Sequence, residues 1–424
     1  MSAAALMSSC PLLRLSPSLM QHVLRQSLRS RDILAVCLTS SHLCDAGKRV
    51  LYEAPVAGGL ERMEMLLNTL VDREDLALWV EELVFDGSGA SSPAFLDLCA
   101  RAIRATRNVV ELNLTALPDL PAVLGACALP KLRTCLLTDT ASATPFLEAN
   151  AARLAALLLA DRADATAPGL ARPLRLPRLR RAVIPLRAAP LVLRPGTPAA
   201  DVHLALARGP APRAADLARL AALAHLPLTA LTLATDRLLP DLVAPAVRAA
   251  GPALERLTVE SARAPGPRAR ARFFDEMERR VGALRGLRVL TVCVRGGPAR
   301  MPTPADLDEM GEVCQRLGAR CPSLSLIIPG LNMYWQPFGG TWFPLAPIQD
   351  YEKFLDLVGF WTMKKLAKDL SLMAPMVEAA RRDTPVQTRE WEESRGVRMR
   401  NPREVPRKYG GWAEDPVEEE AGSE

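Results

Sequence analysis

The sequence predicts an α/β fold in which short parallel strands alternate with helices or extended segments. Two observations predict it: a six-residue apolar phrase recurs along the chain, and helix start signals stand between several of its copies. The phrase is Leu-x-x-Leu-x-Leu, as in LRTCLL at 132–137 and LTALTL at 228–233. Its alternating apolar positions suit a strand that turns every second side chain into a core.

Ten copies of the phrase recur at intervals of 20 to 37 residues. Their first residues are Val80, Val109, Leu132, Leu154, Leu179, Ala199, Leu228, Leu254, Leu287 and Leu324. Most intervals lie near the period of roughly 20–29 residues that is typical of leucine-rich repeats. Strand, loop, helix and loop in succession therefore predict a right-handed leucine-rich-repeat horseshoe over residues 60–332, a solenoid whose strands line the inside of the curve.

Helix signals between the phrases support this alternation. Ser92–Pro93 and Pro240 each precede apolar residues at helical spacing, and residues 269–284 and 304–318 have amphipathic patterns. Residues 162–215 are rich in proline and lack helical periodicity, so shorter or extended segments are expected there, with a disordered loop at 208–214.

Residues 15–52 predict a small unit of three helices. Ser16 is a suitable N-cap with Pro17 at the first helical position, Ser30 and Asp32 can cap a second helix, and Ser40 or Ser41 begins a third turn. A unit of about 40 residues buries too little core to be stable alone, so it should pack on the repeats or on a partner.

This segment resembles the F-box, the helical motif that docks a substrate receptor onto the Skp-family adaptor of a cullin–RING ubiquitin ligase. The matching residues, in order, are Leu15, Pro17, Leu19, Val23, Leu28, Asp32–Ile33, Ser40 and Leu51–Tyr52. Ser16 and Ser18 depart from the proline and glutamate that are usual there. An N-terminal F-box followed by irregular leucine-rich repeats is a recurring layout of that family.

The resemblance implies a non-catalytic substrate receptor of an SCF-type E3 ubiquitin ligase, located in the cytoplasm or the nucleus. It implies that the F-box-like unit, residues 15–55, binds the Skp-family adaptor and through it the cullin complex, while the repeats bind a target protein. The adaptor-binding residues would be Leu15, Pro17, Leu19, Val23, Leu28 and Ile33. The alternative is a leucine-rich-repeat scaffold without a ligase link, in which residues 15–52 only cap the first repeat.

Two further features are candidate partner sites. Seven arginines and no acidic residue fall between Arg172 and Arg194. Arg178, Arg180 and Arg181 could bind an acidic or phosphorylated target; alternatively, the run is only a solvated face.

Nine of the 19 aromatic residues lie between Tyr334 and Trp361. The aromatic candidates for partner binding are Tyr334, Trp335, Phe338, Trp342 and Phe343, placed in a loop at the start of a helical C-terminal cap over 333–382. The cap could equally serve only to seal the last repeat.

The remaining composition argues against other classes. The net charge of +6 is mild, so nucleic acid is not expected as a partner, and no apolar run is long enough to span a bilayer. The nine scattered cysteines predict reduced thiols, and no zinc spacing, P-loop or Gly-x-Ser-x-Gly motif occurs, so neither enzyme activity nor a metal or cofactor is expected. Residues 1–14 and the acidic-ended tail 383–424 are expected to be disordered; residues 1–31 also admit interpretation as a mitochondrial address.

Overall fold

The computed structural model describes residues 15–345 except 28–29, 86–91, 162–168, 207–213, 295–303, 331–332 and 339. The chain forms two compact units, one holding the described residues up to Leu228 and the other those from Thr229 onward. The expectations for residues 1–14, for Leu28, for most of the loop 208–214 and for everything after Leu345 lie outside the described residues. None of the helices in the described part is both long and apolar enough to span a bilayer.

The first unit begins with three helices, α2 (Pro17–Ser27), α3 (Ser30–Cys37) and α4 (Ser41–Glu53), which confirms the predicted helical segment. The backbone N–H of Leu19 donates to Ser16 Oγ at 3.4 Å, so Ser16 caps α2 as its sequence suggests. Met20 and Leu24 of α2 pack against Leu43 and Ala46 of α4 and form a small core of their own.

Helices α5 (Leu60–Asp72) and α6 (Glu74–Ala77) lead into six strands that pair in chain order. These are β1 (Glu82–Val84), β2 (Glu111–Asn113), β3 (Thr134–Thr138), β4 (Ala156–Ala160), β5 (Arg181–Pro185) and β6 (Asp201–Ala205). All five strand pairs within this unit are parallel. The segments between and after them contain α7 (Pro93–Ala105), α8 (Leu120–Leu124), η2 (Ala141–Ala143), α9 (Thr144–Asn150), η3 (Leu186–Ala188), α10 (Ala189–Val192), α11 (Ala214–Ala221) and η4 (Ala222–His225).

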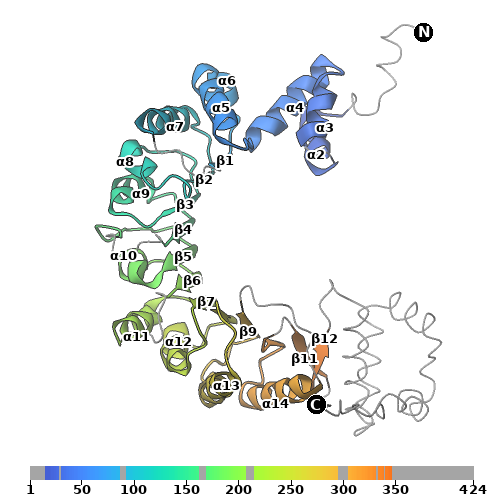
Figure 1. Ribbon diagram of the computed structural model, residues 1–424, viewed down its shortest axis with the longest axis vertical. Coiled ribbons are helices and arrows are strands. Elements are labelled where there is room, and N and C mark those ends of the chain that lie inside the picture. The colour runs from blue at the N-terminus through green and yellow to red at the C-terminus, as the bar shows by residue number, and fades with distance from the viewer. Residues whose placement is uncertain are drawn as a thin grey trace, which may run out of the picture. The chain divides into compact units, whose positions relative to one another are not determined.

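The second unit repeats this architecture and adds a hairpin to it. Strands β7 (Ala230–Thr235), β8 (Arg256–Ser261), β9 (Val289–Val294) and β10 (Leu326–Ile328) are parallel, whereas β11 (Tyr334–Phe338) and β12 (Thr341–Leu345) form an antiparallel hairpin beside β10. The helical segments are η5 (Pro240–Leu242), α12 (Val243–Ala250), α13 (Pro267–Val281) and α14 (Pro304–Arg320). In both units the helices that connect the strands lie on one side of them (Figure 1).

All ten apolar phrases coincide with the ten parallel strands, and their burial follows one rule. The first, fourth and sixth residues of every phrase are buried, as Leu132, Cys135 and Leu137 are in β3. The third and fifth residues lie on the opposite face of the strand and are at least partly accessible, with Ala230 outside this alternation. The third and fifth residues of each phrase therefore supply the side chains on the face of the strands opposite the helices.

One backbone contact recurs from phrase to phrase. The carbonyl oxygen of the second residue accepts hydrogen bonds from two consecutive N–H groups of the next phrase, as Arg133 does from Ala155 and Ala156 at 2.8 and 3.0 Å. Val110 in the first unit and Glu255 in the second accept in the same way. This repeated contact fixes the register of neighbouring strands.

The expectation of short convex segments around residues 162–215 is confirmed where the structure describes them. Between Gly169 and Leu206 the only helical pieces are η3 and the four-residue α10. The loop expected at Tyr334–Phe343 is wrong, because Tyr334–Phe338 and Thr341–Leu345 form the β11–β12 hairpin. The helical part of the cap, expected over 350–380, lies outside the described residues. Pro337 and Pro344 are tolerated there because the hairpin lies at the edge of the sheet.

Candidate functional site

The helical unit formed by α2, α3 and α4 leaves large apolar side chains exposed. Leu19 of α2 is 55% exposed and Leu34 of α3 is 56% exposed, while Leu38, directly after α3, is 89% exposed. Three exposed leucines on a unit this small are therefore candidate contact residues.

The six residues that the F-box resemblance selects fall into different environments. Pro17 and Leu19 are exposed, and Leu15 and Val23 are half-buried, with Leu15 packed against the core of the unit. Ile33, in contrast, is only 4% exposed. Its neighbour Gly47 lets α4 approach α3 so closely that a β-carbon there would collide with Cys37 and crowd Ile33. As the structure stands, Ile33 therefore holds α3 against α4 and presents almost no surface to a partner.

The strand face of the first unit carries a continuous row of half-buried side chains. Cα pairing places Val84, Asn113, Leu136, Leu158, Val183 and His203 side by side across β1 to β6. Three neighbouring members, Leu136, Leu158 and Val183, make the middle of the row aliphatic. Side chains presented at this spacing by rigid strands are well suited to hold an extended partner segment.

A cavity of about 520 Å³ adjoins the β1 end of this row. Its wall combines the linker after α4, including Pro55 and Val56, with Val84, Phe85 and Asn113. Val56 is 91% exposed although it is apolar. The cavity thus extends the row with a second apolar surface in the same unit.

The strand face of the second unit has a different chemistry. Thr232, Thr258 and Thr291 occupy one register position on β7, β8 and β9, and Ile328 of β10 follows them. Neighbouring threonines present hydroxyl groups that can donate and accept hydrogen bonds. The two units therefore offer one mainly aliphatic and one hydroxyl-bearing surface.

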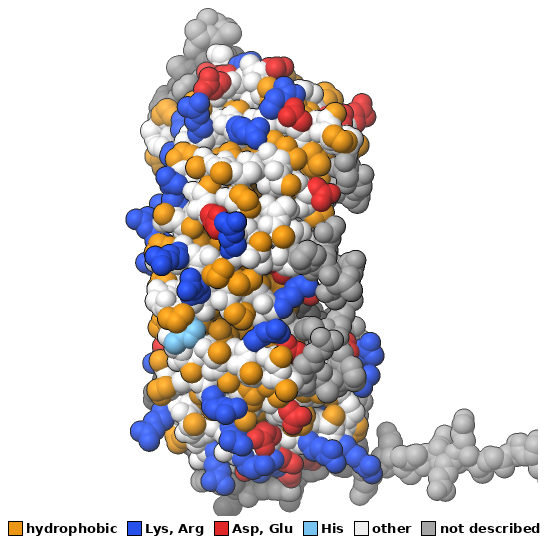
Figure 2. Space-filling model, turned by 90° about the vertical axis from the view of Figure 1, so that its left-hand side faces the viewer, with side chains coloured by type: hydrophobic (Ala, Val, Ile, Leu, Met, Phe, Trp, Pro, Cys, Tyr) orange, Lys and Arg blue, Asp and Glu red, His pale blue; other side chains and the backbone are white. Residues whose placement is uncertain are grey.

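The arginine run lies on the surface, but its members do not act alike. Arg178, Arg180 and Arg181 are exposed, and Arg181 Nε lies 3.6 Å from Asp201 Oδ2. Arg187 is tied inward, with Nε 3.0 Å from Asp139 Oδ2 and Nη2 2.9 Å from Asp161 Oδ1. On the helix-covered side that Figure 2 shows, basic side chains are spread along the surface with apolar ones between them. Arg181 occupies the third position of its phrase, on the strand face opposite the helices, so the run does not form one uniform basic patch.

The aromatic candidates lie mostly in the core. Trp335, Trp342 and Phe343 are buried in the β11–β12 hairpin, and Trp342 packs on α14 where Gly318 leaves no room for a β-carbon. Tyr334 is 39% exposed, and Phe338 belongs to β11, with its side chain outside the described residues. In this arrangement the buried rings seal the end of the second unit, and among the described aromatic candidates Tyr334 keeps an accessible side chain.

The described cysteines are buried or half-buried. No three His, Cys, Asp or Glu side chains there gather as ligands for a metal ion. The described cysteines are free thiols. Burial raises the pKa of Cys99 to about 12 and holds the pKa of Cys135 and of Cys314 well above the usual value, so these thiols remain protonated at neutral pH.

No family model and no curated protein sequence matches this chain.

Sequence reasoning missed two sets of accessible residues, one exposed and one half-buried. Leu34 and Leu38 were not selected, although the helical phase of Ile33 and Val36 could have shown that Leu34 lies on another side of α3. The aliphatic row was missed because all its members occupy the fifth position of the phrase, where the residue type varies from one phrase to the next. Aligning the phrases by position would have found it.

Proposed function

We propose that the chain is the substrate-receptor subunit of an SCF-type ubiquitin ligase, with the helical unit binding a Skp-family adaptor and leucine-rich repeats binding a target protein. The observation that carries the proposal is the exposure of Leu19, Leu34 and Leu38 on a three-helix unit whose own core uses Met20, Leu24 and Leu43. The sequence resemblance of this unit to the F-box supports it independently. We further propose that the ten strand units are leucine-rich repeats stacked as a curved solenoid.

The proposed mechanism is proximity rather than chemistry. A receptor that binds the adaptor at one end and a target along its strand face raises the effective concentration of the target near the ligase. The aliphatic row from Val84 to His203 and the neighbouring cavity are the proposed target surface of the first unit. Transfer of ubiquitin would be performed by the other subunits, in the cytoplasm or the nucleus.

The adaptor contact is tested by co-purification of the full chain with a Skp-family adaptor. Leu19→Asp and Leu34→Asp each place a charge on the exposed apolar surface and should reduce adaptor recovery at least tenfold, because burying an unpaired carboxylate is costly. Met65→Asp is the matched control, since Met65 is 65% exposed but lies on α5 outside the helical unit.

Adaptor recovery that is equal for the wild type and both leucine variants would overturn the ligase proposal. That outcome would leave the alternative, a repeat scaffold in which the three helices cap the first strand unit. The alternative has its own support in a backbone contact, because the N–H of Glu81 donates to the carbonyl oxygen of Glu53 at 2.9 Å and joins α4 to the segment before β1.

A further inference from the structure

A second cavity, of about 400 Å³, lies in the second unit at the carboxyl ends of β7 and β8. Three arginines contribute to its wall, Arg237 after β7, Arg263 after β8 and Arg272 in α13. The remaining lining residues are uncharged, including Leu238, Pro240 and Ala269. No described acidic side chain lines this cavity, so its charged groups are all positive.

Two neighbouring turns of the same construction place Arg237 and Arg263. Thr235 Oγ1 donates to the carbonyl oxygen of Arg237 at 2.7 Å, and Ser261 Oγ donates to that of Arg263 at 2.6 Å. Thr235 and Ser261 are themselves paired at the ends of β7 and β8. Because each hydroxyl bonds to the residue two positions on, both arginines begin at equivalent positions of successive strand units.

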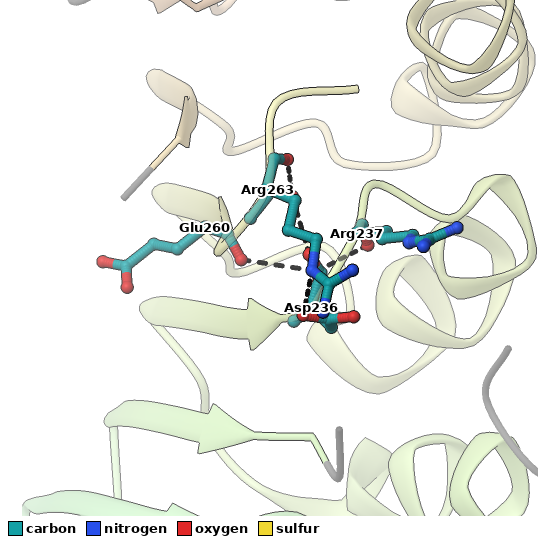
Figure 3. A network of polar contacts seen from close by, with 6 residues as sticks. Asp236, Arg237, Glu260 and Arg263 are labelled. Carbon is teal, nitrogen blue, oxygen red and sulfur yellow. Dashed lines mark hydrogen bonds and ion pairs between the residues drawn. The ribbon is translucent and has the colours of Figure 1, made fainter. Parts of the chain in front are cut away.

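The two turns are also joined to each other. The N–H of Arg263 donates to the carbonyl oxygen of Asp236 at 3.1 Å, and Ser261 Oγ lies 3.4 Å from the same oxygen. Figure 3 shows this network and shows Arg263 lying against Asp236 while the side chain of Arg237 points away from it. The backbone below the cavity is therefore held by hydrogen bonds.

The side chains keep donors for a ligand. Arg263 Nε lies 3.2 Å from Asp236 Oδ1, which orients the guanidinium but leaves the N–H groups of its two Nη atoms for other partners. Within the described residues, neither Arg237 nor Arg272 forms an ion pair. The three cavity arginines thus carry three positive charges against the single carboxylate of Asp236, which pairs with Arg263, and this excess of positive charge favours an anion.

We propose that this cavity binds a phosphate monoester or a similar doubly charged oxyanion through Arg237, Arg263 and Arg272. Guanidinium groups bind tetrahedral oxyanions in bidentate fashion, and a dianion balances the net charge of the three arginines and Asp236. The aliphatic wall formed by Leu238, Leu239 and Pro240 limits hydration on one side of the ligand and strengthens these contacts. The proposal does not depend on the ligase function, because it needs no adaptor.

Calorimetric titration of the purified full chain with inorganic phosphate and with pyrophosphate, at ionic strength balanced with sodium chloride, tests the proposal. We expect saturable binding that Arg237→Ala and Arg272→Ala each weaken about tenfold or more, the loss of one charge-assisted contact. Arg256→Ala is the matched control, because Arg256 is an exposed arginine of β8 outside the cavity. Thermal melts without ligand verify that each variant is folded.

A peptide carrying one phosphoserine between alanines distinguishes a phosphorylated protein from a phosphorylated small molecule as the source of the bound group. Tighter binding of the peptide than of pyrophosphate assigns the cavity to modified proteins, and the reverse assigns it to a phosphorylated small molecule. The proposal is overturned if none of the three probes binds, or if the cavity variants bind as tightly as the wild type and Arg256→Ala.

Discussion

Leu19 and Met20 are neighbours in α2 with opposite environments, because the Leu19 side chain is 55% exposed and Met20 is fully buried. Met20 lies in the core that α2 forms with α4, whereas Leu19 lies outside it. Met20 therefore contributes to the stability of the helical unit, whereas Leu19 contributes to its proposed binding surface.

This contrast gives a first prediction for unfolding measurements. Met20→Ala should lower the free energy of unfolding by about 2–4 kcal/mol, because it removes buried methylene groups and leaves a cavity. Leu19→Ala should change it by less than about 0.5 kcal/mol, as is usual for surface positions. Urea unfolding followed by circular dichroism measures both, and equal losses would show that the helices pack differently.

Asp139 gives a second prediction, because its carboxylate joins distant segments of the first unit. The side chain is 1% exposed, and it accepts hydrogen bonds from the N–H of Leu170 and from Arg187 Nε, both at 3.0 Å. Asp139→Ala leaves these donors without the carboxylate and should cost about 3 kcal/mol.

Two further variants define what Asp139 contributes. Combining Asp139→Ala with Arg187→Ala should cost less than the sum of the two single changes, since the residues interact directly. Arg181→Ala is the comparison, because its ion pair with Asp201 is exposed and should be worth less than about 1 kcal/mol. Strict additivity in the double variant would contradict the direct coupling.

Gly286 supports a third prediction, which concerns the close approach of the segment between α13 and β9 to the segment that precedes β8. A β-carbon at this position would lie 2.8 Å from the carbonyl oxygen of Pro252 and 3.3 Å from that of Leu254. Both are backbone atoms that cannot move aside alone, so Gly286→Ala should destabilise the second unit by about 1–3 kcal/mol. Gly58→Ala is the control, because nothing lies within 4 Å of the added carbon, and it should leave the free energy of unfolding nearly unchanged. An unchanged melting temperature for Gly286→Ala would refute the close approach.

The buried thiols give a fourth prediction, on pH dependence. Burial raises the pKa of Cys99 to about 12, while a thiol in an unfolded chain ionises near pH 8.5. Between these values the unfolded state releases a proton that the native state keeps, so the stability contributed by the neutral thiol is present below pH 8.5 and is lost as the pH rises toward 12. Urea unfolding at pH 7.5 and 10 should show a smaller decrease for Cys99→Val than for the wild type.

Alkylation provides an independent readout for the same thiols. Cys99, Cys135 and Cys314 should react with iodoacetamide only when the protein is unfolded, because their side chains are buried and protonated. Rapid modification of Cys135 in the native protein at pH 7.5 would contradict their burial.

The strands could be predicted from the sequence because each phrase repeats the same requirement, namely three apolar side chains on the side of the core. Leu228, Leu231 and Leu233 are buried as the pattern demands. The helix that starts at Pro93 was equally predictable, since Ser92 Oγ accepts from the N–H of Phe95 at 3.2 Å and so caps it. In both cases residues close together in the sequence are sufficient to determine the local structure.

Other features depend on contacts that local sequence does not encode. Both Leu19 and Met20 fit an apolar stripe at helical spacing, and only the position of α4 decides that Met20 is buried. The prolines and glycines near Tyr334 are typical of a loop, yet pairing with β10 makes the segment a strand. The arginine-lined cavity joins residues of two strand units, so it follows from register rather than from a motif.

The hairpin that closes the second unit limits how this architecture can grow. Strand β11 runs against β10, and each strand of the hairpin contains one proline, Pro337 or Pro344, which lacks an amide hydrogen. A duplicated unit placed between two parallel strands, as β8 lies between β7 and β9, keeps the parallel pairing on both sides, whereas one placed between β10 and β11 would have to replace an antiparallel pair. Engineers who wish to lengthen the protein should therefore splice extra units upstream of Leu326 and leave the pairing of β10 with the hairpin intact.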